Sequence, residues 1–325
     1  MKKILTLSFL ILGAFIGASF SSGREIYVYF ASFGWCCIPI ALIVGVVLYF
    51  VMCFFLNFPL PQNKSKTFKI FETILLVAVF VLSSTMFAGC AELSFDFGGI
   101  ILLIITFSIS ILQCFVDING LKIINYILLP LIFVSLIICV SITGFGFNNS
   151  SNFLASIFGG VKYIGTNSIL LSIFLMQIGD EYSKKEKKIA SIIVAAILTV
   201  FVVIISLVLM GQPDAIKMSS MPLVTLAFSK NLFFGKVLCM VVWFGLITTL
   251  LSGQYVLCNY VKNNTLCKIV LVFISCGFSL LGWGILTTKI YSIVGIVSIF
   301  AVAFLMISNI KRGNKTHIFW YKNTK

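Results

Sequence analysis

The sequence is poor in ionisable side chains, and above all in histidine. Only 10% of its 325 residues are Asp, Glu, Lys or Arg, against about 25% in a typical soluble domain. The single histidine, His317, lies in a polar C-terminal stretch, and no CxxC, HExxH or GxSxG motif occurs. These absences argue against a His-ligated metal centre and a Ser-His hydrolase. We therefore expect no enzyme, and no cofactor or metal beyond a coupling ion.

What the sequence has in excess is apolar residues. They make up 60% of the chain, and its mean hydropathy is +1.15, so a water-soluble core could not hold them. The composition predicts an all-α polytopic membrane protein. The formal charge of +14 does not indicate a nucleic-acid partner here, because most Lys and Arg residues fall in short loops between apolar runs, where they set orientation.

Ten apolar runs approach the roughly 20 residues that a membrane-crossing helix needs. They are residues 4–34, 36–57, 69–91, 97–115, 121–143, 153–181, 189–211, 231–260, 267–283 and 287–309. With the N-terminus inside, most of the 23 basic residues fall on the cytoplasmic side, as the positive-inside rule requires. We expect one transmembrane domain over residues 1–325 in the plasma membrane, with both termini cytoplasmic and the lipid bilayer as its partner.

Two of these runs are too long for one straight crossing. Residues 4–34 would form a helix of about 45 Å, against about 30 Å of hydrocarbon. This run contains the stretch "GASFSSG", and the run 153–181 contains "FGGVKYIGTN". Each opens a block of five helices, residues 1–143 and 144–310, before a tail at 311–325. Interrupted helices at matching positions of two inverted halves indicate a transporter's binding site, so we predict that helices 1 and 6 are broken.

The first run has a second interpretation. "MKK", an apolar stretch and then small residues are also typical of a signal peptide with its cleavage site. The apolar segment "EIYVYFASFG" that follows favours the broken helix, because cleavage would leave this segment too short to cross. An unwound backbone inside a membrane must line a cavity or be covered by protein. Carbonyls near Gly17 would then suit a cation, and amides near Ser22 an anionic group.

The stretch "IGASFSSGREIYVYFASFG" resembles the first-helix pattern G-x-G-F-A-S-G-x-E of the YkvI-like membrane proteins. Ser19 and Ser21 depart from that pattern, where glycine and alanine are usual. The family is a branch of the amino acid–polyamine–organocation superfamily, and the resemblance implies the LeuT-type fold of five plus five inverted helices. It also implies a sodium site between the first-helix break and hydroxyls of the eighth helix.

The resemblance places this cation-binding site at the carbonyls of Gly17 and Phe20 with the hydroxyls of Thr248 and Thr249. The alternative is that these threonines bond carbonyls of their own helix. The fifth helix carries no lysine beyond Lys122 at its mouth, which favours Na⁺ over H⁺ as the coupling ion.

Polar and charged residues at the two breaks are the candidates for binding a solute, since ionisable groups inside a membrane are functional hypotheses by default. Glu25 would pair with Lys162 across the breaks, or both would reach the headgroups, and Arg24 and Lys162 form a candidate gate. The predicted substrate-binding residues are Ser19, Ser21, Ser22, Gly23, Glu25, Tyr163, Thr166 and Asn167.

These features together favour a secondary active transporter for a small organic solute, such as an amino acid, driven by Na⁺ or H⁺ through alternating access. The alternative is a membrane receptor of the same fold that binds its ligand without moving it, as in spore-germinant receptors.

Overall fold

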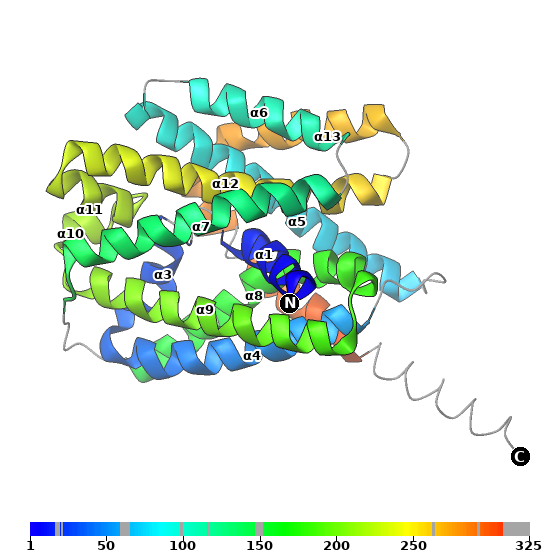
Figure 1. The fold of residues 1–325 in the computed structure, drawn as a ribbon, viewed down its shortest axis with the longest axis horizontal. Coiled ribbons are helices and arrows are strands. Elements are labelled where there is room, and N and C mark those ends of the chain that lie inside the picture. Colours follow the sequence, from blue (N-terminus) through cyan, green and yellow to red (C-terminus); the bar gives the residue numbers. More distant parts are fainter. Residues whose placement is uncertain are drawn as a thin grey trace, which may run out of the picture.

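A computed structural model describes residues 1–16, 20, 22–58, 66–97, 100–115, 118–146, 152–261, 264–290 and 293–307, and these form helices and turns without any strand. The long helices lie side by side in layers (Figure 1). The predicted all-helical fold is thus confirmed for the described part of the chain.

The first half of the chain contains short helical pieces followed by four longer helices. They are α1 (Lys2–Phe15), α3 (Arg24–Tyr29), the 3₁₀ segment η1 (Ala31–Cys36), α4 (Cys37–Asn57), α5 (Lys66–Phe97), α6 (Ile101–Gln113) and α7 (Ile118–Thr143).

The second half repeats the alternation of long helices and short connections. Its elements are α8 (Phe153–Ile178), η2 (Gly179–Glu181), α9 (Lys184–Met210), α10 (Asp214–Lys217), α11 (Pro222–Lys230), α12 (Leu232–Val261), α13 (Thr265–Phe278), η3 (Ser279–Leu281), α14 (Trp283–Ile285), the π-helical turn η4 (Leu286–Ile290) and a last helix at Ile293–Ile307.

Six helices in the described part are long and apolar enough to cross a membrane. They are Ala31–Asn57, Lys66–Leu93, Ile118–Ile138, Phe153–Glu181, Lys184–Met210 and Leu232–Val261. Three shorter apolar helices, Ile101–Gln113, Thr265–Leu281 and Ile293–Ile307, accompany them. The chain is therefore a helical membrane-embedded protein, whereas ten crossings, the compartment and the side of each terminus stay predictions.

The first apolar run is interrupted close to the predicted place. Helix α1 ends at Phe15, and α3 begins at Arg24 after Gly23, whose φ of +78° is left-handed. That conformation costs a residue with a Cβ roughly 1–2 kcal/mol, so glycine suits this junction. Because α3 has only six residues, its aligned peptide dipoles are few, and the predicted anion site at its N-terminus loses its main physical support.

The prediction of a broken sixth helix is wrong. Helix α8 runs from Phe153 to Ile178 without interruption. Its glycines serve close packing instead: a Cβ on Gly159 would lie 2.4 Å from the backbone oxygen of Tyr29, and one on Gly165 would lie 2.7 Å from that of Gly295. Small residues that admit a neighbouring backbone are typical of membrane helix interfaces. In α8 they therefore bring α3 and the last helix close while the helix itself continues.

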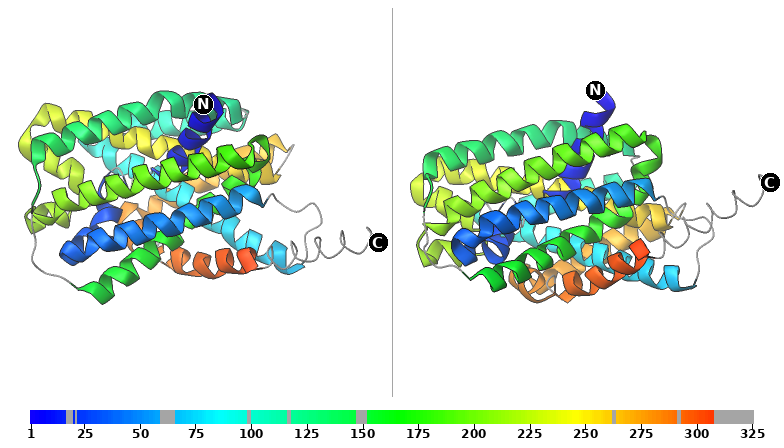
Figure 2. Two further views of the ribbon diagram at one scale, coloured as in Figure 1. Left: turned by 60° about the horizontal axis from the view of Figure 1, so that its bottom comes forward. Right: turned by 90° about the horizontal axis from the view of Figure 1, so that it is seen from below.

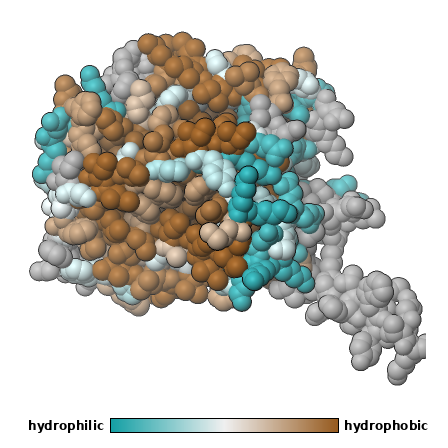
Figure 3. All heavy atoms as spheres, viewed as in Figure 1, coloured by the Kyte–Doolittle hydropathy of each residue, from teal (hydrophilic) through white to brown (hydrophobic). Residues whose placement is uncertain are grey.

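Helices α5, α8 and α12 form the interior. More than 70% of the apolar window of each is buried within the fold, against 28% for the span in α7. Helix α1 runs steeply across the long helices and reaches into their midst (Figure 2). The face seen in Figure 3 is apolar over most of its area, with hydrophilic residues gathered mainly toward its two sides. Polar side chains on α1, α3, α8 and α12 are consequently the ones that the fold brings together away from lipid.

Candidate functional site

Glu25 lies at the centre of a buried polar group between α3 and α8. Its side chain is only 7% exposed. The Thr166 hydroxyl and the Asn167 side-chain amide both lie 3.3 Å from Glu25 Oε1, and the amide donates to it. Three of the predicted substrate-binding residues, Glu25 on α3 and the adjacent Thr166 and Asn167 on α8, are thus in direct contact.

The α8 side chains are held in place by their own helix. Asn167 Nδ2 also donates to the Tyr163 carbonyl oxygen at 3.0 Å, so its two hydrogens divide between the helix and Glu25. The Thr166 hydroxyl has one hydrogen, and it shares that hydrogen among the Glu25 carboxylate and the carbonyls of Lys162 and Tyr163. Gly295 packs against the Thr166 methyl group, and this contact holds the Thr166 side chain in its rotamer.

Tyr163 adds an aromatic wall beside this carboxylate. Its ring centroid lies 6.1 Å from that of Phe15, 6.3 Å from Tyr29 and 5.0 Å from Phe30. The side chain is 1% exposed, and its hydroxyl has no hydrogen-bond partner in the described part of the chain. A buried hydroxyl without a partner costs free energy, so this group is free to bond a ligand.

The predicted Glu25–Lys162 ion pair does not form in this structure. Lys162 is exposed on α8, whereas Glu25 is buried and bonded to Thr166 and Asn167. The burial of Glu25 explains this, because the exposed Lys162 ammonium group would have to lose its hydration to reach the carboxylate. Among the described residues, no basic side chain pairs with the Glu25 carboxylate.

Arg24 clamps a neighbouring loop instead of pairing with an acid. Its Nη1 donates to the carbonyl oxygens of Lys217 and Ser219, both at 3.3 Å. The Leu223 amide donates to the Ser22 carbonyl at 2.9 Å, and Trp283 Nε1 donates to the Ser220 carbonyl at 3.3 Å. The α10–α11 loop is therefore tied both to the interruption of the first run and to α14.

Thr249 of α12 lies against the end of α1, one helical turn before the predicted level. Its hydroxyl donates to the Gly13 carbonyl at 3.1 Å. Thr248 bonds the Gly245 carbonyl of its own helix at 3.0 Å, which was the alternative considered for these residues. The structure thus brings α12 against the end of α1, with Gly13 supplying the carbonyl. The predicted cation site at Gly17 stays a prediction, because Gly17 lies outside the described residues.

The remaining predicted residues divide by location. Ser22 and Phe20 are buried near the end of the interruption, and Gly23 forms its left-handed turn. The predictions for Gly17, Ser19 and Ser21 lie outside the described residues.

Asn125 of α7 is a polar residue that the sequence reasoning missed. Its side chain is fully buried, and both its amide atoms lack partners in the described part of the chain. They lie against Gly13, within 2.6 Å of where a Cβ would stand. The signal was present in the sequence, because an asparagine inside the apolar run "INYILLP" is costly in a membrane.

A comparison with models of known protein families finds no match, and no curated protein matches the chain.

Proposed function

We propose that the protein is a secondary active transporter for a small organic solute that carries an amino group, such as an amino acid. One observation carries the proposal: a buried carboxylate without a basic partner among the described residues, at an interruption of the first apolar run. Burying a charge is costly unless it is paired, and the free energy of this arrangement falls when a cationic group or a proton reaches Glu25.

The surroundings of Glu25 favour an ammonium group as the bound cation. The carboxylate accepts from ammonium donors, and the aromatic cluster of Tyr29, Phe30 and Tyr163 supplies ring electrons of the kind that attract a cation. The unpartnered Tyr163 hydroxyl offers a further hydrogen bond to the same solute.

The α10–α11 loop supports a mechanism in which access to this site alternates. The bonds that Arg24, Leu223 and Trp283 donate all go to backbone carbonyls, so the loop can detach without breaking a salt bridge, and water can hydrate the half-buried Arg24. In the ten-crossing arrangement with cytoplasmic termini, this loop lies outside. Arg24 then acts as an outer latch, and the Gly13 carbonyl with Thr249 is the place for a coupling Na⁺.

A receptor without transport is the second candidate, and the continuity of α8 favours it. Alternating access in inverted-repeat proteins uses interrupted helices in both halves, whereas this fold interrupts the first run and leaves α8 intact. A single flexible junction would suffice for a ligand-induced signal.

Uptake into proteoliposomes separates these functions. Single radiolabelled amino acids would be offered with an inward Na⁺ gradient, with an inward H⁺ gradient and with neither. Gradient-dependent accumulation is expected, and Glu25→Gln should lower it about 10- to 100-fold, since a hydrogen bond to a charged group contributes about 1.5–3 kcal/mol. Asp180→Asn, which changes an exposed acid of η2 just beyond the end of α8, should leave uptake unchanged.

The thermal stability of the purified protein gives the second readout. A solute that raises the melting temperature but never accumulates would replace the transporter with the receptor. If neither binding nor uptake depends on Glu25, both candidates are wrong.

A further inference from the structure

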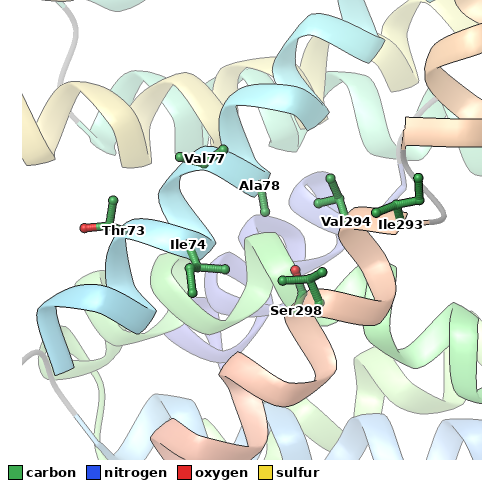
Figure 4. A pocket seen from close by; sticks show the side chains of 8 residues that line it. Thr73, Ile74, Val77, Ala78, Ile293, Val294 and Ser298 are labelled. Atoms are coloured by element: carbon green, nitrogen blue, oxygen red, sulfur yellow. The ribbon is translucent and has the colours of Figure 1, made fainter. Parts of the chain in front are cut away.

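Two apolar grooves flank one face of α5 near its first turns. The first, of about 230 Å³, lies between α5 and the last helix, and Ile74, Ala78 and Ser298 line it. Figure 4 shows Ile74 and Ala78 reaching from α5 toward the helix that carries Ser298. The second, of about 260 Å³, lies on the other side of α5, against α12 and α13, with Leu257 and Leu271 in its wall.

Thr73 and Val77 line both grooves, so together they form a ridge that separates them. The Thr73 hydroxyl donates to the Lys69 carbonyl at 2.8 Å, which leaves the ridge apolar in effect. Val77 is 56% exposed and Ile293, at the rim of the first groove, is 63% exposed. In a membrane-embedded protein, such side chains face acyl chains.

The volume of each groove is enough for only part of a ligand. Pockets for a whole drug-sized ligand measure roughly 300–1,000 Å³, and each groove is smaller than that. Two narrow apolar channels on either side of one ridge match two alkyl chains joined at one end.

Basic side chains stand at the end where the chains would be joined. Lys66 and Lys69 are exposed on the first turn of α5, and 3.6-residue periodicity places them on the same face as Thr73 and Val77. Thr73 lies about 10 Å along the helix from Lys66. On α13, Lys268 precedes Leu271 by one turn and stands above the second groove. The nearest acid on α5, Glu72, is 3% exposed and does not offset this charge at the surface.

We propose that this face of α5 binds a diacyl phospholipid with an anionic headgroup, one acyl chain in each groove and the headgroup at Lys66, Lys69 and Lys268. Lysines beside the hydrocarbon boundary attract anionic lipids. A larger groove of about 600 Å³ between α4 and α9 also lies below lysines. It is a single channel, and the acids Asp180, Glu181 and Glu186 stand among the lysines at that end, so charge favours α5.

The test measures lipid binding to the purified full-length protein by native mass spectrometry. Three probes test separately whether binding requires two acyl chains and a negative headgroup. They are dioleoyl phosphatidylglycerol, the matching lysophosphatidylglycerol with one chain, and dioleoyl phosphatidylcholine with a neutral headgroup. The diacyl anionic lipid should bind most tightly. Lys66→Gln should weaken it about 5-fold, and Lys66→Gln with Lys69→Gln about 30-fold, while phosphatidylcholine binding stays unchanged.

The control pair is Lys185→Gln with Lys188→Gln on α9, above the other groove, and we expect it to leave binding unchanged. A second variant, Ala78→Phe, fills the first groove and should reduce the preference for two chains over one without altering the preference for negative charge. The proposal is overturned if the α9 pair causes the loss in place of the α5 pair, if one chain binds as well as two, or if a second protein copy displaces the lipid from this face.

Discussion

Two stretches with similar composition behave differently in this fold. Residues 13–23 and 159–167 are both rich in glycine and small polar residues, yet the helix ends in the first stretch and continues through the second. In the first, Gly23 adopts a left-handed backbone. In the second, Gly159 and Gly165 stay helical, and their missing side chains make room for neighbouring backbone.

The difference teaches that glycine content does not by itself specify an interruption in a membrane helix. A helix in hydrocarbon keeps its backbone hydrogen bonds because each lost bond costs several kcal/mol. It ends only where other groups satisfy the backbone, as the Leu223 amide does for the Ser22 carbonyl. The α8 glycines have no such partners to gain, and they provide contact between helices instead.

The largest effect on stability should come from Gly159→Ala. Its Cβ would lie 2.4 Å from the Tyr29 carbonyl oxygen, and backbone cannot yield as a side-chain tip can. We expect a loss of about 3 kcal/mol in unfolding free energy, since overpacking costs typically 1–3 kcal/mol and occasionally more. The midpoint of unfolding in a detergent titration measures it.

Gly277→Ala is the matched control, because a Cβ on this helical glycine of α13 meets nothing within 4 Å. It should be neutral or slightly stabilising, as alanine favours helix. If both substitutions have the same effect, glycine in α8 is not there for packing.

Gly23→Ala should cost about 2 kcal/mol. The left-handed backbone contributes roughly 1–2 kcal/mol, and the Leu223 side chain, whose Cγ is 2.7 Å from the added Cβ, must also shift. Gly144→Ala separates the two contributions, because Gly144 has a φ of +71° and a Cβ on it would meet nothing within 4 Å. It should show the backbone cost alone, and a larger loss at Gly144 than at Gly23 would contradict this account.

The sequence predicted the features that depend on composition and local order. Apolar runs located the long helices. The cluster of small and charged residues after Phe15 predicted that the helix resumes near Ser22, two residues before the observed start of α3 at Arg24. Treating the two glycine-rich stretches as neighbours singled out Glu25, Thr166 and Asn167 as candidates for one site, and the structure brings their side chains into contact. The contact itself was not predicted, because the sequence reasoning paired Glu25 with Lys162 and assumed a break in both helices.

Features that depend on which face a residue presents were not predictable. Nothing in the local sequence says that Gly159 faces Tyr29, that Arg24 bonds loop carbonyls, or that Asn125 rests on Gly13. Each requires helices that are distant in the chain to be packed first. The contact of Thr249 with the Gly13 carbonyl illustrates the limit, because it depends on the relative depth of α1 and α12, which the local sequence does not give.

Thr249→Val should reduce stability less than Gly159→Ala or Gly23→Ala. It tests whether the hydrogen bond between α12 and the end of α1 stabilises the fold. The hydroxyl is buried and donates to the Gly13 carbonyl between two helices, and interhelical hydrogen bonds in membranes contribute about 0.6 kcal/mol on average, up to about 1.7. We expect a loss of about 1 kcal/mol in the same detergent titration. Thr248→Val removes a bond within one helix, to the Gly245 carbonyl, and should cost less. An equal loss from both would mean that α12 is held to α1 by apolar packing, with the Thr249 hydroxyl satisfying its own helix in solution, and would remove the oxygen pair at which a coupling cation is proposed to bind.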